Sequence, residues 1–173
     1  MLTVYDGELR VSYRQFYVES RPEVFDGPLS DSRAGQNNGL CGAAVPGHLF
    51  LTTGLHTGRV GLTVEVHESE PTLDEAWEDI VEAPFHPAST AAVLTPWGEA
   101  PLCTVELNVV PHRVRYGASA MDLTVDQELS VLDGGSIIDR YLLQFWPAPP
   151  APDEVIKQTS RSAAYWHTCA RSV

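Results

Sequence analysis

The chain has little positive charge. Its 173 residues include 11 Lys and Arg against 23 Asp and Glu, which gives a formal net charge of −12 at pH 7. Proteins that bind nucleic acid or anionic membrane surfaces need cations that face phosphate. The shortage of basic residues therefore argues against both ligands. It favours a basic protein partner or, as the alternative, an acidic surface that only keeps the protein dispersed.

Long hydrophobic runs and paired cysteines are also missing. The longest stretch without a charged residue, 34–58, is broken repeatedly by glycine and is not a membrane-spanning helix. No basic segment followed by an apolar one marks a secretory signal peptide at the N-terminus. The three cysteines, Cys41, Cys103 and Cys169, are too widely spaced for a disulfide framework or a zinc site. We therefore expect a cytoplasmic protein with reduced thiols and no cofactor.

A period of two residues dominates the sequence. Hydrophobic residues make up 43% of the chain, enough for one domain with its own core. Over Arg59–His67, aliphatic residues at 60, 62, 64 and 66 alternate with mostly polar ones, the pattern of a half-buried antiparallel strand. Further strands are expected at 8–18, 48–53, 80–85, 90–94, 102–107, 113–116 and 137–146. Short strands separated by glycine and proline turns predict an all-β fold, an antiparallel β-sandwich.

Two internal segments depart from the strand pattern. Residues 21–47 are rich in Gly, Pro, Ser, Asn and Asp and predict a long loop. Thr72–Asp79 predicts one or two helical turns, with Thr72 as the N-cap and Glu75 at the capping-box position.

The C-terminal part begins with a proline-rich linker, residues 147–152, which is expected to be stiff and extended. The pattern after it predicts a helix that starts near Asp153. We therefore expect a β-sandwich domain at 1–146, the linker, and a C-terminal helix within 153–173 that packs on the same domain. Ile156, Ala163 and Trp166 are expected to face that domain.

Negative charge is densest between Glu65 and Glu82, where no Lys or Arg occurs. A surface of this kind favours fast encounter with a basic protein, such as the active-site cleft of a nuclease, where carboxylates can stand in for phosphates. The alternative is a solvated strand edge, loop and helix. The eight carboxylates are Glu65, Glu68, Glu70, Asp74, Glu75, Glu78, Asp79 and Glu82. The first seven, together with Trp97 in an exposed Pro-Trp-Gly turn, are the candidate partner-binding residues.

Two catalytic alternatives remain open. Cys41 lies among small residues that could expose a thiolate to a histidine, but no cationic neighbour in the sequence would lower the pKa of its thiol. The six histidines offer no pair at the short spacings that deliver metal ligands from one strand or helix. A small hydrolase that uses Cys41 or a histidine-based metal site is therefore the alternative function. An assembly subunit that associates through its C-terminal helix is a third.

The segment Glu8-Leu-Arg-Val-Ser-Tyr-Arg-Gln-Phe-Tyr-Val-Glu19 resembles the opening strand of the competence protein J family. The resemblance continues, in the same order, through the segments at 48–53, 59–68 and 81–85, and covers about half the chain. Members of that family are regarded as inhibitors of a DNA-entry nuclease. The resemblance implies a compact β fold and a non-catalytic, protein-binding role. We therefore predict an acidic intracellular binding protein of the immunity or inhibitor type, whose partner is a basic enzyme such as a nuclease.

Overall fold

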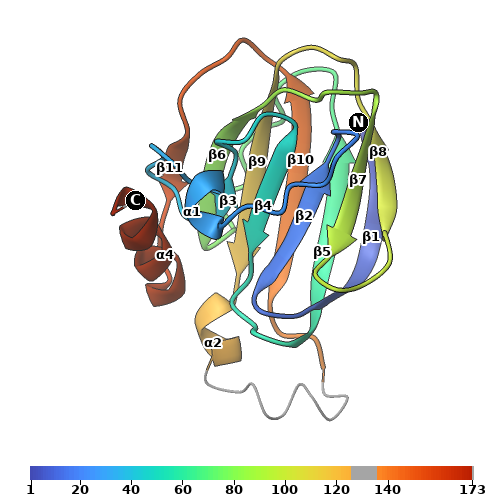
Figure 1. Ribbon diagram of the computed structural model, residues 1–173. Helices are drawn as coiled ribbons and strands as arrows, with labels where there is room; N and C mark the ends of the chain where they lie inside the picture. The colour runs from blue at the N-terminus through green and yellow to red at the C-terminus, as the bar shows by residue number, and fades with distance from the viewer. Residues whose placement is uncertain (126–135, 173) are drawn as a thin grey trace.

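The computed structural model describes residues 1–125 and 136–172, most of which belong to two β-sheets stacked as layers (Figure 1). Sheet A has the order β1-β5-β10-β9-β6-β11 and sheet B the order β3-β4-β2-β7-β8. The strands of sheet A are β1 (Leu2–Val11), β5 (Gly58–Val66), β6 (Asp79–Phe85), β9 (His112–Ser119), β10 (Arg140–Pro147) and β11 (Glu154–Lys157). Those of sheet B are β2 (Gln15–Glu19), β3 (Cys41–Gly42), β4 (His48–Thr52), β7 (Ala91–Pro96) and β8 (Cys103–Glu106). The helices are α1 (Leu29–Ser32), α2 (Met121–Val125) and α4 (Arg161–Arg171), so the all-β prediction with a C-terminal helix is confirmed.

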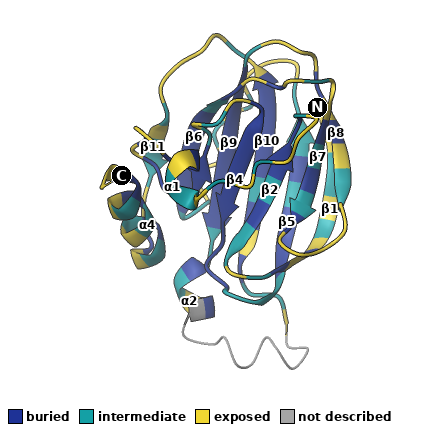
Figure 2. Ribbon diagram, viewed as in Figure 1, coloured by how far each residue is buried: buried dark blue, intermediate teal, exposed yellow. Residues whose placement is uncertain are grey.

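The core lies between the two sheets, where the period-two pattern directs alternate side chains. On β10, Tyr141, Leu143 and Phe145 are at most 1% exposed and belong to this core. Phe16 of sheet B meets Tyr116 of sheet A with ring centroids 6.1 Å apart, so aromatic contacts join the layers. Figure 2 shows the same distribution, with buried residues concentrated along the strands. Interdigitation of two inner faces is the usual way in which a β-sandwich is stabilised.

The strand predicted at residues 8–18 is wrong in one respect, because two strands in different sheets occupy this segment. β1 ends at Val11 and β2 begins at Gln15. Between them Tyr13 and Arg14 adopt φ angles of 56° and 60°, which turn the chain from sheet A to sheet B. Left-handed backbone at two consecutive non-glycine residues is uncommon and marks a tight, structurally determined corner.

Sheet A is mixed rather than purely antiparallel. Within the described ranges, the ladder between β5 and β10 is parallel, and every other strand pair is antiparallel. β10 lies between β5 and β9; it runs parallel to β5 and antiparallel to β9. Strand direction is not encoded in a period of two, which explains why the pattern predicted a fully antiparallel sheet.

No helix forms at Thr72–Asp79. Apart from one turn, in which the Trp77 amide donates to the Asp74 carbonyl at 3.5 Å, the segment is an irregular connection that ends where β6 begins at Asp79. The reason is geometric. β5 and β6 are separated in sheet A by β10 and β9, so the chain between them must cross two strands. An extended backbone covers about 3.3 Å per residue, whereas a helix covers about 1.5 Å.

The C-terminal helix begins at Arg161, not near Asp153. Glu154–Lys157 instead forms β11, which pairs with β6 at the edge of sheet A. The Ser160 hydroxyl then caps α4 by accepting a hydrogen bond from the Ala163 amide at 3.0 Å. The expected 21–47 loop contains the short α1 and β3.

One of the glycine turns that separate the predicted strands, the Gly134-Gly135 pair before the strand expected at 137–146, lies outside the described residues. Among the residues that the structure describes, no helix has the length and apolarity needed to cross a membrane.

Candidate functional site

The predicted acidic segment is the connection that crosses the outer face of sheet A. We call residues 67–78 the acidic crossover. Two residues of the sheet hold it: Arg115 donates from Nη1 to the Pro71 carbonyl at 2.9 Å, and Gly117, which has no side chain, leaves the space that the Trp77 ring occupies. A Cβ at Gly117 would approach that ring to 3.1 Å. Lys157 of β11 donates to the Glu75 carbonyl at 2.8 Å. The crossover is therefore fastened at three points along its length.

Four of the eight carboxylates have internal partners and serve the fold. Asp79 is fully buried and accepts hydrogen bonds from the Thr159 and Ser160 amides, so it does not belong to an exposed surface. Glu78 accepts from the Ala120 amide at 2.8 Å. The side chain of Glu65 is 16% exposed and contacts His67 and Gln144, while Glu82 contacts Arg113 and Arg115.

Glu82 is the centre of a buried ion-pair network on the outer face of sheet A. Its carboxylate accepts from Nε of Arg113 and Nε of Arg115, each at 2.9 Å. Arg113 also donates to the carbonyls of Ala151 and Pro152, which fixes the proline-rich linker over the sheet. Trp146 lies beneath Arg115, with the guanidinium carbon 5.1 Å from the ring centroid. One carboxylate therefore organises the crossover, the linker and two strands.

The remaining four carboxylates are exposed on the crossover: Glu68, Glu70, Asp74 and Glu75. Glu70 reaches Arg115 at 3.3 Å, but its side chain is 69% exposed. Asp74 accepts only from the nearby Ala76 amide among the described residues. The exposed acidic surface is thus smaller than the sequence predicted, with four negative charges on the acidic crossover.

Trp97 is exposed as expected, but it lies at an end of sheet B and not beside the acidic crossover. It occupies the turn between β7 and β8, where Gly98 has a φ of 70°. Its side chain is 43% exposed and packs edge-on against Tyr13 with 4.6 Å between ring centroids. Trp97 and the acidic crossover therefore face different sides of the sandwich.

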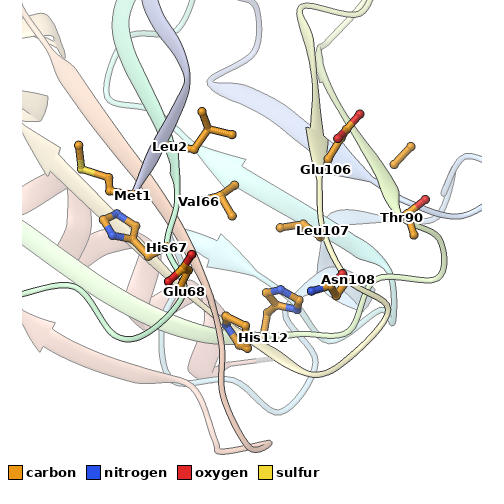
Figure 3. Close-up of a pocket in the computed structure, with 12 residues that line it drawn as sticks. Met1, Leu2, Val66, His67, Glu68, Thr90, Glu106, Leu107, Asn108 and His112 are labelled. Atoms are coloured by element: carbon orange, nitrogen blue, oxygen red, sulfur yellow. The ribbon is translucent and has the colours of Figure 1, made fainter.

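A cavity of about 800 Å³ opens at one end of the sandwich, next to the start of the acidic crossover. In Figure 3, His67 and Glu68 lie on one side of this cavity, Glu106 lies on the other, and His112 lies below. His112 donates from Nδ1 to the Val110 carbonyl at 2.7 Å, and burial lowers its pKa. Within residues 1–125 and 136–172, no group of three His, Cys, Asp or Glu side chains is placed to hold a metal ion.

Cys41 is buried in the core and is not placed as a nucleophile. Its side chain has no exposed surface, and burial raises the pKa of the thiol to about 12. A thiol in this state stays protonated at neutral pH, whereas the thiolate is the reactive form. The hydrolase alternative therefore has no support at Cys41.

A buried pair on the outer face of sheet B was not predicted. Glu19 of β2 and His48 of β4 lie opposite each other in the strand register, and Nδ1 of His48 is 3.1 Å from Glu19 Oε2. His48 is 2% exposed and Glu19 is 9% exposed. Both residues lie in predicted strand segments, but only the pairing of β2 with β4 brings them together.

Comparison with solved structures confirms the suspected resemblance at the level of the fold. The chain is similar to ComJ, inhibitor of the DNA degrading activity of NucA, from Bacillus subtilis, with a TM-score of 0.57 and 18% identity; the match covers 85% of this chain and 98% of ComJ. It is also similar to the protein called crocagin biosynthetic gene J, with a TM-score of 0.52 and 12% identity over 86% of this chain and 100% of that one. No protein-family description and no curated protein matches the sequence.

Proposed function

We propose that this protein binds a basic protein partner and inhibits it, and that the partner is a DNA-degrading nuclease. The observation that carries the proposal is the fold shared with ComJ, which extends over nearly the whole of that nuclease inhibitor. The exposed carboxylates of the acidic crossover support it independently, because their negative charge is complementary to the positive charge of a surface that binds phosphate. A cytoplasmic location is part of the proposal, since all three cysteines are free thiols, as in a reducing compartment.

The exposed carboxylates Glu68, Glu70, Asp74 and Glu75 are the proposed contact residues for that nuclease. They lie on a segment that is fastened to sheet A by Arg115, Trp77 and Lys157, so binding does not have to order a free loop first. A preorganised surface loses less conformational entropy when a partner binds.

The test is an inhibition assay with purified protein and each DNA-degrading nuclease encoded by the same genome. One of these nucleases should lose its activity on double-stranded DNA when the protein is present in stoichiometric amount. The variant Glu68→Gln, Glu70→Gln, Asp74→Asn, Glu75→Gln should inhibit at least about tenfold less well, because it removes the steering charge. If no nuclease is inhibited by the unmodified protein, the proposal is wrong.

A matched control separates local charge from net charge. The variant Asp6→Asn, Glu8→Gln, Asp31→Asn, Glu106→Gln removes four exposed carboxylates outside the crossover, with the same change in net charge. It should inhibit like the unmodified protein. Equal losses in the two variants would show that overall charge, and not the crossover, determines binding.

A further inference from the structure

The outer face of sheet B carries a pocket of about 540 Å³ that neither the fold comparison nor the acidic crossover explains. Its floor is formed by side chains that point away from the core, among them Tyr17 of β2 and Phe50 of β4, whose ring centroids are 5.3 Å apart. The segment 24–29 forms one wall, and the turn that contains Trp97 forms another. In Figure 1 this segment crosses in front of sheet B on its way to α1.

Glu19 fixes both the wall and the floor of this pocket. Its carboxylate accepts hydrogen bonds from the Arg21 amide and Nε, each at 3.1 Å, and from the Phe25 amide at 3.0 Å. The remaining contact is to Nδ1 of His48 at 3.1 Å. The Phe25 ring then packs over the His48 ring, with 4.9 Å between centroids. The wall is thus attached to the sheet through one buried side chain.

The second ring nitrogen of His48 has no such partner. An ionised carboxylate can only accept hydrogen bonds, so Nδ1 of His48 carries the proton in this pair. Burial lowers the pKa of His48, which keeps the ring neutral and leaves Nε2 as an acceptor. Nε2 is buried and has no hydrogen-bond partner among the described residues, although the ring lines the pocket. A buried acceptor without a donor is unfavourable, and a ligand that brings a donor removes that penalty.

The rest of the lining indicates what kind of donor fits. Tyr17 and Trp97 present aromatic rings, whose faces attract cations. The rings of Phe25 and Phe50 also line the pocket, and each already has a guanidinium of this chain over it, that of Arg21 at 5.7 Å and that of Arg33 at 5.5 Å. The exposed carboxylates Asp26 and Glu99 lie at the pocket, and no Lys or Arg side chain among the described residues lines it. Arg21 and Arg10 pair with Glu19 and Glu99 from outside the lining. The pocket therefore combines aromatic walls, negative charge and one unpaired acceptor.

We propose that this pocket binds a basic side chain, a lysine or an arginine, presented by a protein partner. The cation would donate to His48 Nε2, and its aliphatic stem would lie against Tyr17 and Trp97. The net charge of −12 favours a basic partner for this face as well. The identity of the partner rests on the proposed function, but the chemistry of the pocket does not.

The experiment uses the protein alone, so that its failure is distinct from failure of the nuclease assay. N-acetyl-argininamide and N-acetyl-lysinamide are titrated while NMR follows the Trp97 indole N–H and the His48 ring. N-acetyl-norleucinamide, which has an uncharged apolar side chain, is the matched control probe. We expect saturable chemical-shift changes of both groups with at least one cationic probe. The dissociation constant of the norleucine control should be at least about fivefold larger than that of the cationic probe. Equal binding of the norleucine probe, or no shift with either cation, would overturn the proposal.

Two variants locate the contact. In His48→Asn, the side-chain amide nitrogen occupies the place of Nδ1 and keeps the bond to Glu19, while the Nε2 acceptor is lost. Trp97→Ala removes an exposed ring at a turn and leaves the core intact. Each variant should weaken binding of the cationic probe by about fivefold or more, with an unchanged circular dichroism spectrum. Probe binding as tight as that of the wild type in both variants would place the cation elsewhere and contradict the proposal.

Discussion

Glu82 is the shared counter-ion of two buried arginines of sheet A, Arg113 and Arg115. The side chains of Arg113 and Arg115 are 8% and 6% exposed. Removing one member of a buried ion pair is far more damaging than removing an exposed one, because the charge left behind is poorly solvated. The network thus explains why an arginine pair tolerates burial beneath the linker and the acidic crossover.

Glu82→Gln should therefore lower the free energy of unfolding by roughly 2–3 kcal/mol, just below the range of about 3–5 kcal/mol for broken buried pairs, because glutamine still accepts a hydrogen bond. Glu70→Gln is the matched control. It removes a carboxylate that contacts the same Arg115 but is 69% exposed, and it should cost less than about 1 kcal/mol. Urea unfolding measures both. Equal effects would mean that the buried network does not stabilise the fold.

His167 predicts a pH dependence of stability. Burial lowers its pKa from 6.5 to about 4, and its Nδ1 accepts a hydrogen bond from the Gly39 amide at 2.9 Å. The unfolded chain binds a proton more readily than the folded one, so this contribution is complete above pH 6.5 and is lost as the pH falls towards 4. The lost stability is about 3 kcal/mol.

Comparison of the wild type with His167→Asn isolates this contribution, because the pKa values of His48 and His112 are also lowered by burial. The asparagine Oδ1 can accept from Gly39 but does not titrate. Between pH 7.5 and pH 4.5, the wild type should lose more stability in urea unfolding than the variant. Parallel pH profiles would show that His167 is not buried in its neutral form.

The helix α4 is held by contacts with the long loop rather than with the sheets alone. Gly39 lies so close to it that a Cβ there would meet the Trp166 carbonyl at 2.0 Å. The Trp166 ring covers the buried guanidinium of Arg33 at 4.8 Å and packs against the core. Of the three residues expected on the inner face of the helix, Ala163 is fully buried and Trp166 packs against the core, whereas Ile156 lies in β11 and not in the helix.

Trp166→Ala should lower the melting temperature clearly. We expect a loss of about 2 kcal/mol, below the 3–5 kcal/mol of a fully buried aromatic because this ring is partly exposed. That corresponds to a decrease of about 4–8 °C for a chain of this length. Tyr165→Ala, one residue earlier and 62% exposed, is the control and should change the melting temperature little. A similar decrease in both variants, or in neither, would contradict docking through Trp166.

The sequence predicted most strands because one buried face imposes a period of two, but it did not predict where the chain changes sheets. The signal was present in the parity of the core positions, which are odd at Leu9 and Val11 and even at Phe16 and Val18. The acidic crossover and β11 were missed for another reason. Their conformation follows from the distance between β5 and β6 and from the free edge beside β6, which are properties of the assembled sheet.

The candidate residues were predictable only in part. Glu68, Asp74 and Glu75 stood out by charge and are exposed, whereas Asp79 has the same charge pattern but is fully buried. No local pattern distinguishes these cases, because burial depends on which partner amides the fold supplies. The pair of Glu19 and His48 depends in the same way on the β2–β4 register.

The whole molecule carries its negative charge unevenly. Much of the carboxylate charge within 65–82 is matched by buried partners, and the exposed remainder is gathered on the acidic crossover. Trp97 and the pocket beside it lie in the other sheet. The two proposed contacts thus occupy different faces, and each can be tested while the other stays intact.

The central claim is that the acidic crossover steers a basic nuclease onto this protein. Its most direct test is the association rate with the nuclease found in the inhibition assay, measured for the wild type and both four-carboxylate variants at about 50 mM and 500 mM salt. Electrostatic steering acts on encounter and is screened beyond about 14 Å at 50 mM salt and beyond about 4 Å at 500 mM. We predict that salt, or removal of Glu68, Glu70, Asp74 and Glu75, slows association at least tenfold (~1.4 kcal/mol) and changes dissociation much less. The control variant should associate like the wild type. An association rate that neither salt nor the crossover variant changes would contradict the claim.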